Sequence, residues 1–351
     1  MQSTIMVGCI FYFSMQTAYY HQKLTVCFKQ YKEEITMKMK EFKEELVAGM
    51  EKAFDRNHLE VTFCNRMVNK LNESYEGMVI TPKGSNVGVT LNINNMYEAY
   101  ENGKSLSEII EKASDIAMKS LDNKPQFDMA TLTNYDAMKE KLIVDVVSTK
   151  ANKDMLANIP HKEMEDMSVV YRFEVGAFED GRATILATNQ MIETMGVSAE
   201  QLHADAMENA PKNHPAEIKG MLETFSEMMG ASPEELILMG MNPSPADEKM
   251  IVASVPDKRH GACVITYPHF MEDAAEKMGG DFFILPSSIH EVLLVKDDGS
   301  LTVEELKTMV MDINASEVQP EDKLTDNVYH YDCQNHIFES AEKYEKKQLT
   351  A

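Results

Sequence analysis

The sequence lacks several features by which common classes of protein are recognised. No apolar run approaches the ~20 residues that a membrane-spanning helix needs, so we expect no membrane insertion. The 5 cysteines are odd in number, far apart and never arranged as Cys-x-x-Cys, which argues against a disulfide framework. Tryptophan is absent, whereas methionine is frequent at 28 residues. Because thioethers oxidise readily, this composition favours a reducing compartment, and we expect a cytoplasmic protein.

Positive charge is also scarce, and this bears on the partners of the protein. The chain has 34 Lys and Arg residues against 57 Asp and Glu, and its formal net charge at pH 7 is -23. No stretch of the sequence gathers Lys and Arg. Such a surface repels nucleic-acid phosphates and anionic lipids, so we expect neither nucleic acid nor membrane as a partner, whereas a protein partner is compatible with it. With 44% hydrophobic residues in 351, the chain can bury one large core or two smaller ones.

Residues 1–36 differ from the rest of the chain. They contain a short apolar run, residues 5–13, but neither the basic start nor the small-residue cleavage site of a signal peptide. Residues 32–34 back-translate to a purine-rich string of the kind that binds ribosomes, shortly before Met37 and Met39. We therefore expect translation to begin at one of these methionines, and residues 1–36 to be a mis-annotated or disordered extension.

Residues 37–121 are expected to form a small N-terminal α+β unit. From Met39 onward, apolar residues recur at helical spacing and predict a first helix. Three strand-like runs follow, and turn residues between the last two predict a three-strand meander. Two further helices complete the unit, the second of them begun by the capping box of Ser105 and Glu108. The strand-like runs are residues 59–68, 75–81 and 87–93.

Residues 126–338 are expected to form a larger C-terminal α+β unit. Capping boxes predict helices after Ser198, Ser232 and Thr302, and Pro215 predicts the start of another helix. Strand-like runs alternate with these helices, and the run at 142–147 fits either a strand or the buried end of a helix. The other expected strands are residues 167–175, 182–187, 250–255, 262–267, 282–285, 289–295 and 328–331.

The fold class that follows from these patterns is α+β. We expect antiparallel or mixed sheets with helices packed on them, arranged as two α/β units that can share one core. Residues 339–351 are polar and helical in pattern, and we expect them to form a solvated tail.

Residues 282–295 combine strand character with reactive side chains. Two apolar runs flank a Pro-Ser-Ser break, and Ser287, Ser288, His290 and Glu291 lie within five residues of one another, which suggests a hydrolase. Side chains alternate between the faces of a strand, however, so adjacent His290 and Glu291 cannot pair without a bend. The sequence also has no G-x-S-x-G elbow. We therefore favour a central hairpin whose serine hydroxyls satisfy backbone groups in the turn.

Two sets of histidines could form a site if the fold brought them together. His330, Cys333 and His336 are three possible zinc ligands, but a fourth ligand is missing nearby and a straight strand would separate positions three apart. His260, His269 and His290 fall near consecutive strands and could converge, although structural histidines are the simpler interpretation. The glycines of the chain lack a Walker or Rossmann context, so no nucleotide or other cofactor is predicted.

Several strings of the sequence resemble a known family in order and spacing. Together they are similar to the uncharacterised bacterial domain-of-unknown-function family 5688 of anaerobic Gram-positive bacteria, over about residues 39–338. More distantly, the first unit and the Ser198 helix resemble an uncharacterised family related to the YtpQ protein. The resemblance implies a bacterial, cytoplasmic protein and supplies no catalytic residues. The strings are residues 84–87, 96–103, 158–161, 196–209, 214–218, 261–268, 283–292 and 326–332.

These observations favour a non-catalytic binding or regulatory protein, because no complete catalytic constellation is recognisable. The competing hypothesis is a hydrolase-like enzyme that uses Ser288 or Ser287 with His290. The two hypotheses differ in one geometric respect. An enzyme requires a serine hydroxyl within hydrogen-bond reach of the imidazole in an open pocket, whereas a binding protein does not.

Overall fold

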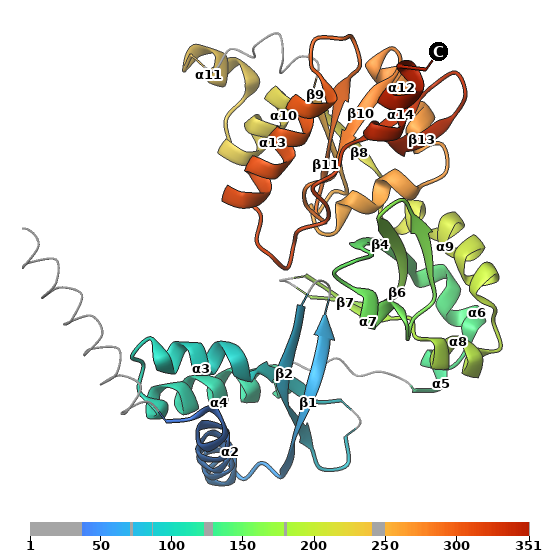
Figure 1. Ribbon diagram of the computed structural model, residues 1–351. Coiled ribbons are helices and arrows are strands. Elements are labelled where there is room, and N and C mark those ends of the chain that lie inside the picture. Colours follow the sequence, from blue (N-terminus) through green and yellow to red (C-terminus); the bar gives the residue numbers. More distant parts are fainter. Residues whose placement is uncertain are drawn as a thin grey trace, which may run out of the picture. The chain divides into compact units, whose positions relative to one another are not determined.

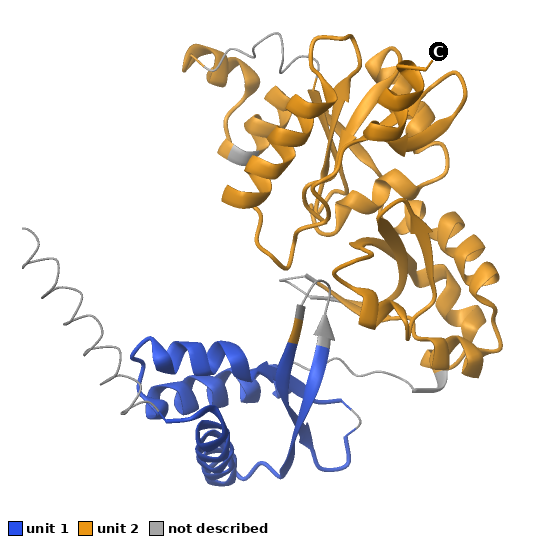
Figure 2. Ribbon diagram, in the orientation of Figure 1, with its two compact units in different colours: residues 1–68, 75–124 blue, residues 69–74, 125–351 orange. Residues whose placement is uncertain are grey.

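The structure is a computed structural model, and Figure 1 shows its helices and strands. It describes residues 37–70, 73–85, 87–122, 129–178, 181–240 and 250–350. The expectations for residues 1–36 and for the start of translation lie outside these residues. The chain divides into two compact units, which Figure 2 distinguishes by colour: residues 1–68 with 75–124, and residues 69–74 with 125–351. No helix in the described part is long and apolar enough to cross a membrane.

Unit 1 combines a three-stranded sheet with three helices. Its elements are α2 (Met39–Arg56), β1 (Val61–Lys70), β2 (Glu73–Pro82), β3 (Val89–Asn92), α3 (Ile93–Glu101) and α4 (Leu106–Asp122). The strand order is β1-β2-β3. Phe42, Leu46, Met50 and Phe54 recur every four residues along α2 and form one buried stripe. This stripe packs with apolar residues of β2 and α4 in a single core.

Unit 2 begins with a four-stranded antiparallel sheet and the helices around it. The elements are α5 (Met129–Leu132), α6 (Tyr135–Met138), η1 (Lys139–Lys141), β4 (Leu142–Ser148), α7 (Lys153–Leu156), β5 (His161–Met164), β6 (Met167–Phe178), β7 (Gly181–Leu186), α8 (Asn189–Met195) and α9 (Ala199–Asn213). β6 is the central strand, because β4 pairs along one edge and β5 and β7 share the other. The run at 142–147 is therefore a strand.

A six-stranded antiparallel sheet forms the rest of unit 2. The elements are β8 (Glu217–Gly220), α10 (Met221–Met229), α11 (Pro233–Leu238), β9 (Met250–Ser254), η3 (Gly261–Thr266), α12 (Phe270–Met278), β10 (Phe282–Leu285), β11 (Val292–Lys296), α13 (Val303–Ser316), β12 (Tyr329–Asp332), β13 (Ile337–Ser340) and α14 (Ala341–Gln348). The strand order is β13-β12-β10-β11-β9-β8. The predicted hairpin thus lies at the centre of the sheet, and the α+β class is confirmed.

The two faces of this sheet belong to different cores, as the alternation along the central strands requires. Phe282, Ile284 and Leu294 pack into the main core of unit 2, which also contains residues of η3, α12 and the four-stranded sheet. Phe283 and Val295 point to the other face, where α13 and α14 cover them.

The prediction of a strand at residues 262–267 is wrong. These residues form η3, a 3₁₀ helix whose first five residues are buried. Both edges of β9 are already occupied, by β8 and β11, so no neighbouring edge of β9 was open to another strand. A short apolar run that is buried on all sides carries no periodicity that would separate the two conformations.

Two further predictions in unit 2 differ from the structure. Pro215 does not open a helix: residues 217–220 form the edge strand β8, which pairs with β9, and α10 begins only at Met221. Pairing with β9 overrides the helical pattern in this segment. The expected solvated tail at 339–351 contains part of β13 and all of α14, in which Ala341 is only 1% exposed.

Candidate functional site

The loop between β10 and β11 contains the serine and histidine that the sequence suggested. The Ser288 hydroxyl accepts a hydrogen bond from the backbone nitrogen of His290 at 3.0 Å, so it satisfies the turn. The carbonyl of Ser287 accepts from the backbone nitrogen of Leu324. Glu291 is exposed. The structure therefore does not place the imidazole on a serine hydroxyl.

The ring of His290 is instead engaged on both nitrogens. Its Nδ1 accepts from the backbone N–H of His260 at 3.2 Å, and its Nε2 lies 3.3 Å from Asp322 Oδ1. Because Nδ1 accepts, a neutral His290 ring carries its proton on Nε2, the nitrogen that faces the Asp322 carboxylate. The His260 and His290 rings also meet edge to face, with centroids 5.7 Å apart. Two of the three histidines that could converge do so, and His290 fixes the backbone of His260.

The three possible zinc ligands turn to different partners. His330 is fully buried and its Nε2 lies 3.2 Å from Asp297 Oδ2, whereas His336 Nδ1 lies 3.3 Å from Glu272 Oε1. The Cys333 thiol is hydrogen-bonded to Asp281, and this interaction raises its pKa. Among the residues that the structure describes, no three His, Cys, Asp or Glu side chains are grouped so as to hold a metal ion.

A different part of unit 2 gathers several charged side chains around one cavity. It is a cavity of about 170 Å³ on one face of the four-stranded sheet, which we call the arginine pocket. Alternation along β4, β6 and β7 puts polar side chains on this face, while Val144, Tyr171 and Phe173 point to the main core. The pocket is lined by Ile143, Asp145, Arg172, Arg182, Thr184, His214, Asp257, Arg259 and His260.

The arginines are the distinctive feature of the arginine pocket. The whole chain has only five arginines, Arg56, Arg66, Arg172, Arg182 and Arg259, and the last three line this one cavity. They come from β6, from β7 and from the loop after β9. Lysine, by contrast, is spread along the whole chain. Arginine is the residue that recognises carboxylates and phosphates through a planar, two-pronged donor, so its concentration here indicates binding of an oxyanion.

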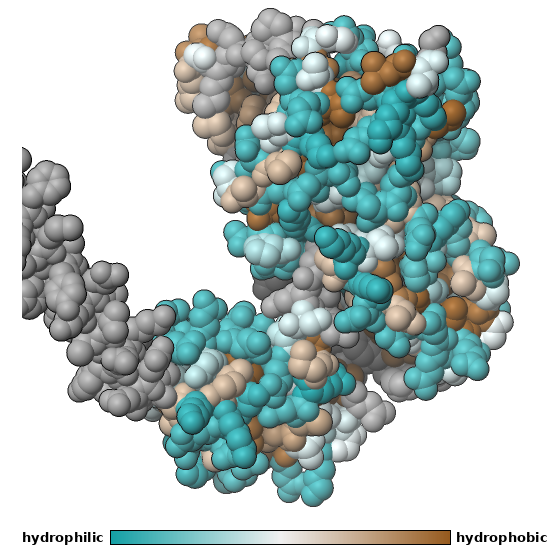
Figure 3. Space-filling view, viewed as in Figure 1, coloured by the Kyte–Doolittle hydropathy of each residue, from teal (hydrophilic) through white to brown (hydrophobic). Residues whose placement is uncertain are grey.

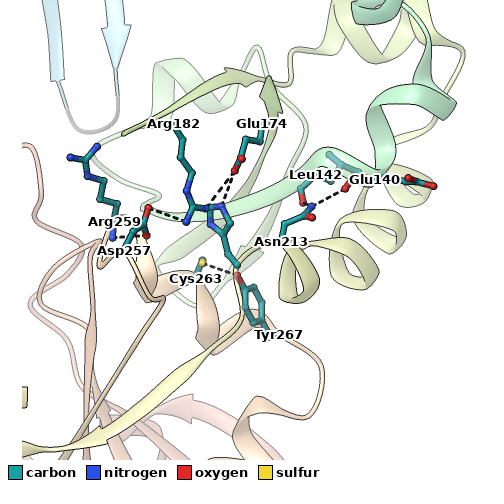
Figure 4. Close-up of polar contacts among 10 residues, drawn as sticks. Glu140, Leu142, Glu174, Arg182, Asn213, Asp257, Arg259, Cys263 and Tyr267 are labelled. Atoms are coloured by element: carbon teal, nitrogen blue, oxygen red, sulfur yellow. Dashed lines mark hydrogen bonds and ion pairs between the residues drawn. The ribbon is translucent and has the colours of Figure 1, made fainter. Parts of the chain in front are cut away.

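Carboxylates hold two of these guanidinium groups in place. Arg172 donates from Nε to buried Asp145 and from Nη1 to Thr184 at 3.2 Å. Arg182 bridges Glu174 and Asp257, with Nη2 3.0 Å from Asp257 Oδ2. Figure 4 shows this chain of ion pairs and the side chain of Arg259 extending away from it. The ion pairs fix the orientation of the donors before any ligand arrives.

Two histidines complete the wall of the arginine pocket. His214 Nε2 lies 3.1 Å from Glu174 Oε2, yet burial, followed by the charge of Arg182, lowers its pKa to about 4, so it is neutral at pH 7. His260 adopts the left-handed backbone conformation, with φ at 58°. Its Nδ1 is buried 3.6 Å from Asp145 Oδ2 and has no hydrogen-bond partner there. This nitrogen is a polar atom that a ligand could satisfy.

The surrounding contacts position these residues, and they include a buried cysteine. Asn213, the last residue of α9, donates to the carbonyls of Glu140 and Leu142 and so anchors His214 beside β4 (Figure 4). Cys263 lies 3.3 Å from the Tyr267 hydroxyl, and burial raises the pKa of its thiol to about 12. A buried thiol with such a pKa is protonated at neutral pH and does not attack a substrate.

Comparison with known proteins assigns the family. The model of the family of unknown function DUF5688 matches residues 39–333, most of the chain. The chain belongs to this family. No curated protein and no solved structure matches this DUF5688 chain. The resemblance predicted from the sequence strings is thereby confirmed for this family.

Sequence reasoning missed the arginine pocket in this DUF5688 member, although two signals were available. Asp145 interrupts an otherwise apolar strand, and Arg172 interrupts another. A charge inside a buried strand requires a partner, so each of these residues implied the other. The scarcity of arginine was the second signal. Neither signal predicts that Asp257 and Arg259 line the same pocket, because their loop reaches it only through the tertiary fold.

Proposed function

We propose that this protein is a non-catalytic binding or regulatory protein whose arginine pocket holds a small oxyanion, a carboxylate or a phosphoryl group. The observation that carries the proposal is the convergence of Arg172, Arg182 and Arg259 on one cavity of a chain with five arginines and a net charge of -23. The pocket's own carboxylates pair with Arg172 and Arg182, and the guanidinium donors that these ion pairs do not use are the groups that would bind an anion.

The ion pairs within the pocket support this proposal. Asp145 pairs with Arg172, and Glu174 and Asp257 pair with Arg182, but each guanidinium carries five N–H donors. Asp145 and Thr184 engage Nε and Nη1 of Arg172, so Arg172 retains donors for a ligand. The carboxylates thus orient the guanidinium groups. An anion binds more tightly to these fixed donors, because their side chains lose little further conformational entropy on binding.

The size of the pocket limits the ligand. A volume of about 170 Å³ is well below the ~300–1,000 Å³ of sites for drug-sized molecules. Inorganic phosphate or a short organic acid is the ligand class of this size. The competing hydrolase hypothesis has less support, because Ser288 accepts from the backbone of His290 and the imidazole points to Asp322.

The cysteines support the cytoplasmic location that we propose with this function. Cys64, Cys263 and Cys333 are free in the described part of the chain. Free thiols of this kind persist in a reducing compartment.

The test is titration calorimetry of the full chain with phosphate and with succinate at constant ionic strength. The variant is Arg259→Gln, because Arg259 lies in an exposed loop and is not part of the Arg172–Asp145 ion pair. A charge-assisted hydrogen bond contributes about 1.5–3 kcal/mol, so we expect Kd to rise roughly 10- to 100-fold.

The matched control is Lys258→Gln. Lys258 is the neighbouring residue, carries the same charge and is exposed, but it pairs with Glu227 outside the arginine pocket. We expect its Kd to match that of the unmodified protein. Equal weakening in both variants would reveal a general charge effect and contradict the proposal. Absence of saturable binding of both anions in the millimolar range would contradict it as well.

A further inference from the structure

Unit 1 has a cavity that is larger than the arginine pocket and opposite in character. It has a volume of about 480 Å³ and lies between α3 and α4, with β3 at its base. We call it the apolar groove. Figure 3 shows apolar side chains at the surface over these two helices. The groove is lined by Leu91, Asn92, Asn95, Met96, Ala99, Lys104, Glu108, Ile109, Lys112, Ala113 and Ile116.

The apolar groove exists because small residues line it on both helices. Ala99 of α3 and Ala113 of α4 leave a space that larger side chains would fill, between walls made by Met96 and Ile109. The edge is open, and Ile116 is 50% exposed. Apolar surface in a concave site of this volume matches that of sites that bury a small molecule.

The rim gives the groove a polarity that its floor lacks. Lys104 and Lys112 lie at its edge, with Asn92 and Asn95 nearby. Glu108 lies between the lysines, but its carboxylate accepts from the backbone nitrogen and the hydroxyl of Ser105 and so belongs to the helix cap. These hydrogen bonds lower the pKa of Glu108 and fix its position. The charge of Lys104 also contributes to lowering the pKa of Glu108, so the two lysines face one carboxylate and leave a net positive charge at the mouth of an apolar space.

We propose that the apolar groove binds an anionic amphiphile, namely an aliphatic carboxylate whose alkyl chain lies between α3 and α4 and whose head meets Lys104 and Lys112. The site is separate from the arginine pocket and from the function proposed there, since the two lie in different units. The class of ligand follows from two independent features: the apolar floor requires a chain, and the lysine rim selects a negative head over an uncharged one.

The test uses the full chain and the dye 1-anilinonaphthalene-8-sulfonate, which combines an apolar ring system with an anionic group. We expect saturable fluorescence that octanoate, decanoate and dodecanoate displace at concentrations below micelle formation. Affinity should rise roughly three- to fourfold for each added methylene until the groove is filled. Decanol, with the same chain and no charge, should bind more weakly than decanoate.

Two variants locate the site. Lys112→Glu should weaken decanoate roughly fivefold and leave decanol unchanged, because it reverses one charge at the rim. Ala99→Leu should weaken both ligands at least tenfold, since it fills the groove. The matched control is Lys119→Glu: Lys119 is exposed on the same helix but lies outside the lining, so the affinity should not change. Lys112 is exposed, so its variant tests the proposal even where Ala99→Leu fails to fold.

Three outcomes would overturn the proposal. The first is absence of displacement by any of the carboxylates. The second is decanol binding as tightly as decanoate, which would remove the role of the lysines. The third is equal weakening by Lys112→Glu and Lys119→Glu, which would show a long-range effect of charge.

Discussion

At the scale of single residues, the few buried charged and histidine side chains have specific partners. The Asp145 side chain is 3% exposed inside β4, where an unpaired carboxylate would be strongly unfavourable, and Arg172 supplies its counter-charge. His330 is another such point. It is fully buried, its ring stacks on that of Tyr344 at 3.6 Å, and its Nδ1 has no hydrogen-bond partner. Because burial lowers the pKa of His330, this histidine makes the folded state sensitive to protonation.

Buried histidines predict that stability falls in mild acid. Burial lowers the pKa of His214 to about 4 and also lowers that of His330, whereas an unfolded histidine titrates near ~6.5. Between these values the unfolded chain binds more protons, so the free energy of unfolding decreases as pH falls from 7 to about 4. For His214 the loss is about 3 kcal/mol. Urea unfolding across this pH range measures it.

A variant of His330 tests how much this histidine contributes to the pH dependence of the free energy of unfolding. His330→Phe retains a ring against Tyr344 but cannot take up a proton, so the decrease in the free energy of unfolding between pH 7 and 5 should become smaller. His336→Gln is the control, because His336 is 63% exposed. A pH slope unchanged by His330→Phe would show that His330 is not protonated on unfolding in this range.

At the scale of elements, one backbone contact explains why η3 begins where it does. A Cβ placed on Gly261 would lie 2.1 Å from Ser254 Oγ, 2.5 Å from the His290 carbonyl oxygen and 2.7 Å from the Val255 nitrogen. Two of these three atoms belong to the backbone and cannot move alone. Gly261 therefore lets η3 approach β9 and the loop after β10, the same loop in which His290 holds His260.

The Gly261→Ala variant should accordingly be destabilised by about 1–3 kcal/mol, because the backbone must shift to admit the methyl group. It should also weaken anion binding, since His260 precedes Gly261 directly. The control is Gly176→Ala, where the nearest atom to the added methyl group lies 3.9 Å away. Its free energy of unfolding should change by no more than about 0.5 kcal/mol. Equal Tm values for the two variants in thermal unfolding would contradict this explanation.

Elements with local signals were predictable from the sequence. The capping boxes at Ser232 and Thr302 both form reciprocal hydrogen bonds, and the β10–β11 hairpin lies where strand alternation placed it. The errors at β8 and η3 have one physical cause. In both segments the conformation depends on whether an edge of β9 is open, and that is decided by strands distant in sequence. Apolar periodicity predicts which residues are buried, but it does not predict which strand they pair with.

At the scale of the whole molecule, the arginine pocket could not be predicted from local patterns either, because its residues are distant in sequence. The arginine pocket joins Asp145, Arg172, Arg182 and Arg259, and no short motif contains more than one of the arginines. The sequence therefore directed attention to Ser288 and His290, which are close in sequence but are not paired through their side chains. His290 still belongs to the neighbourhood of the pocket, because it accepts from the backbone of His260. Its role there is positioning.

The net charge of -23 leads to a prediction for the whole chain that also reports on the arginine pocket. Like charges destabilise a compact state, and raising ionic strength from ~0.01 M to ~0.15 M shortens the screening length from ~30 Å to ~8 Å. Sodium chloride should therefore raise Tm.

Sodium phosphate at the same ionic strength should raise Tm further, because a ligand of the folded state adds RT ln(1 + [L]/Kd), about 1.4 kcal/mol at ten times Kd. In Arg259→Gln most of this phosphate increment should be lost, while Lys258→Gln should keep it. An increment that persists equally in both variants would come from exclusion of phosphate from the protein surface and would count against a site at the arginines.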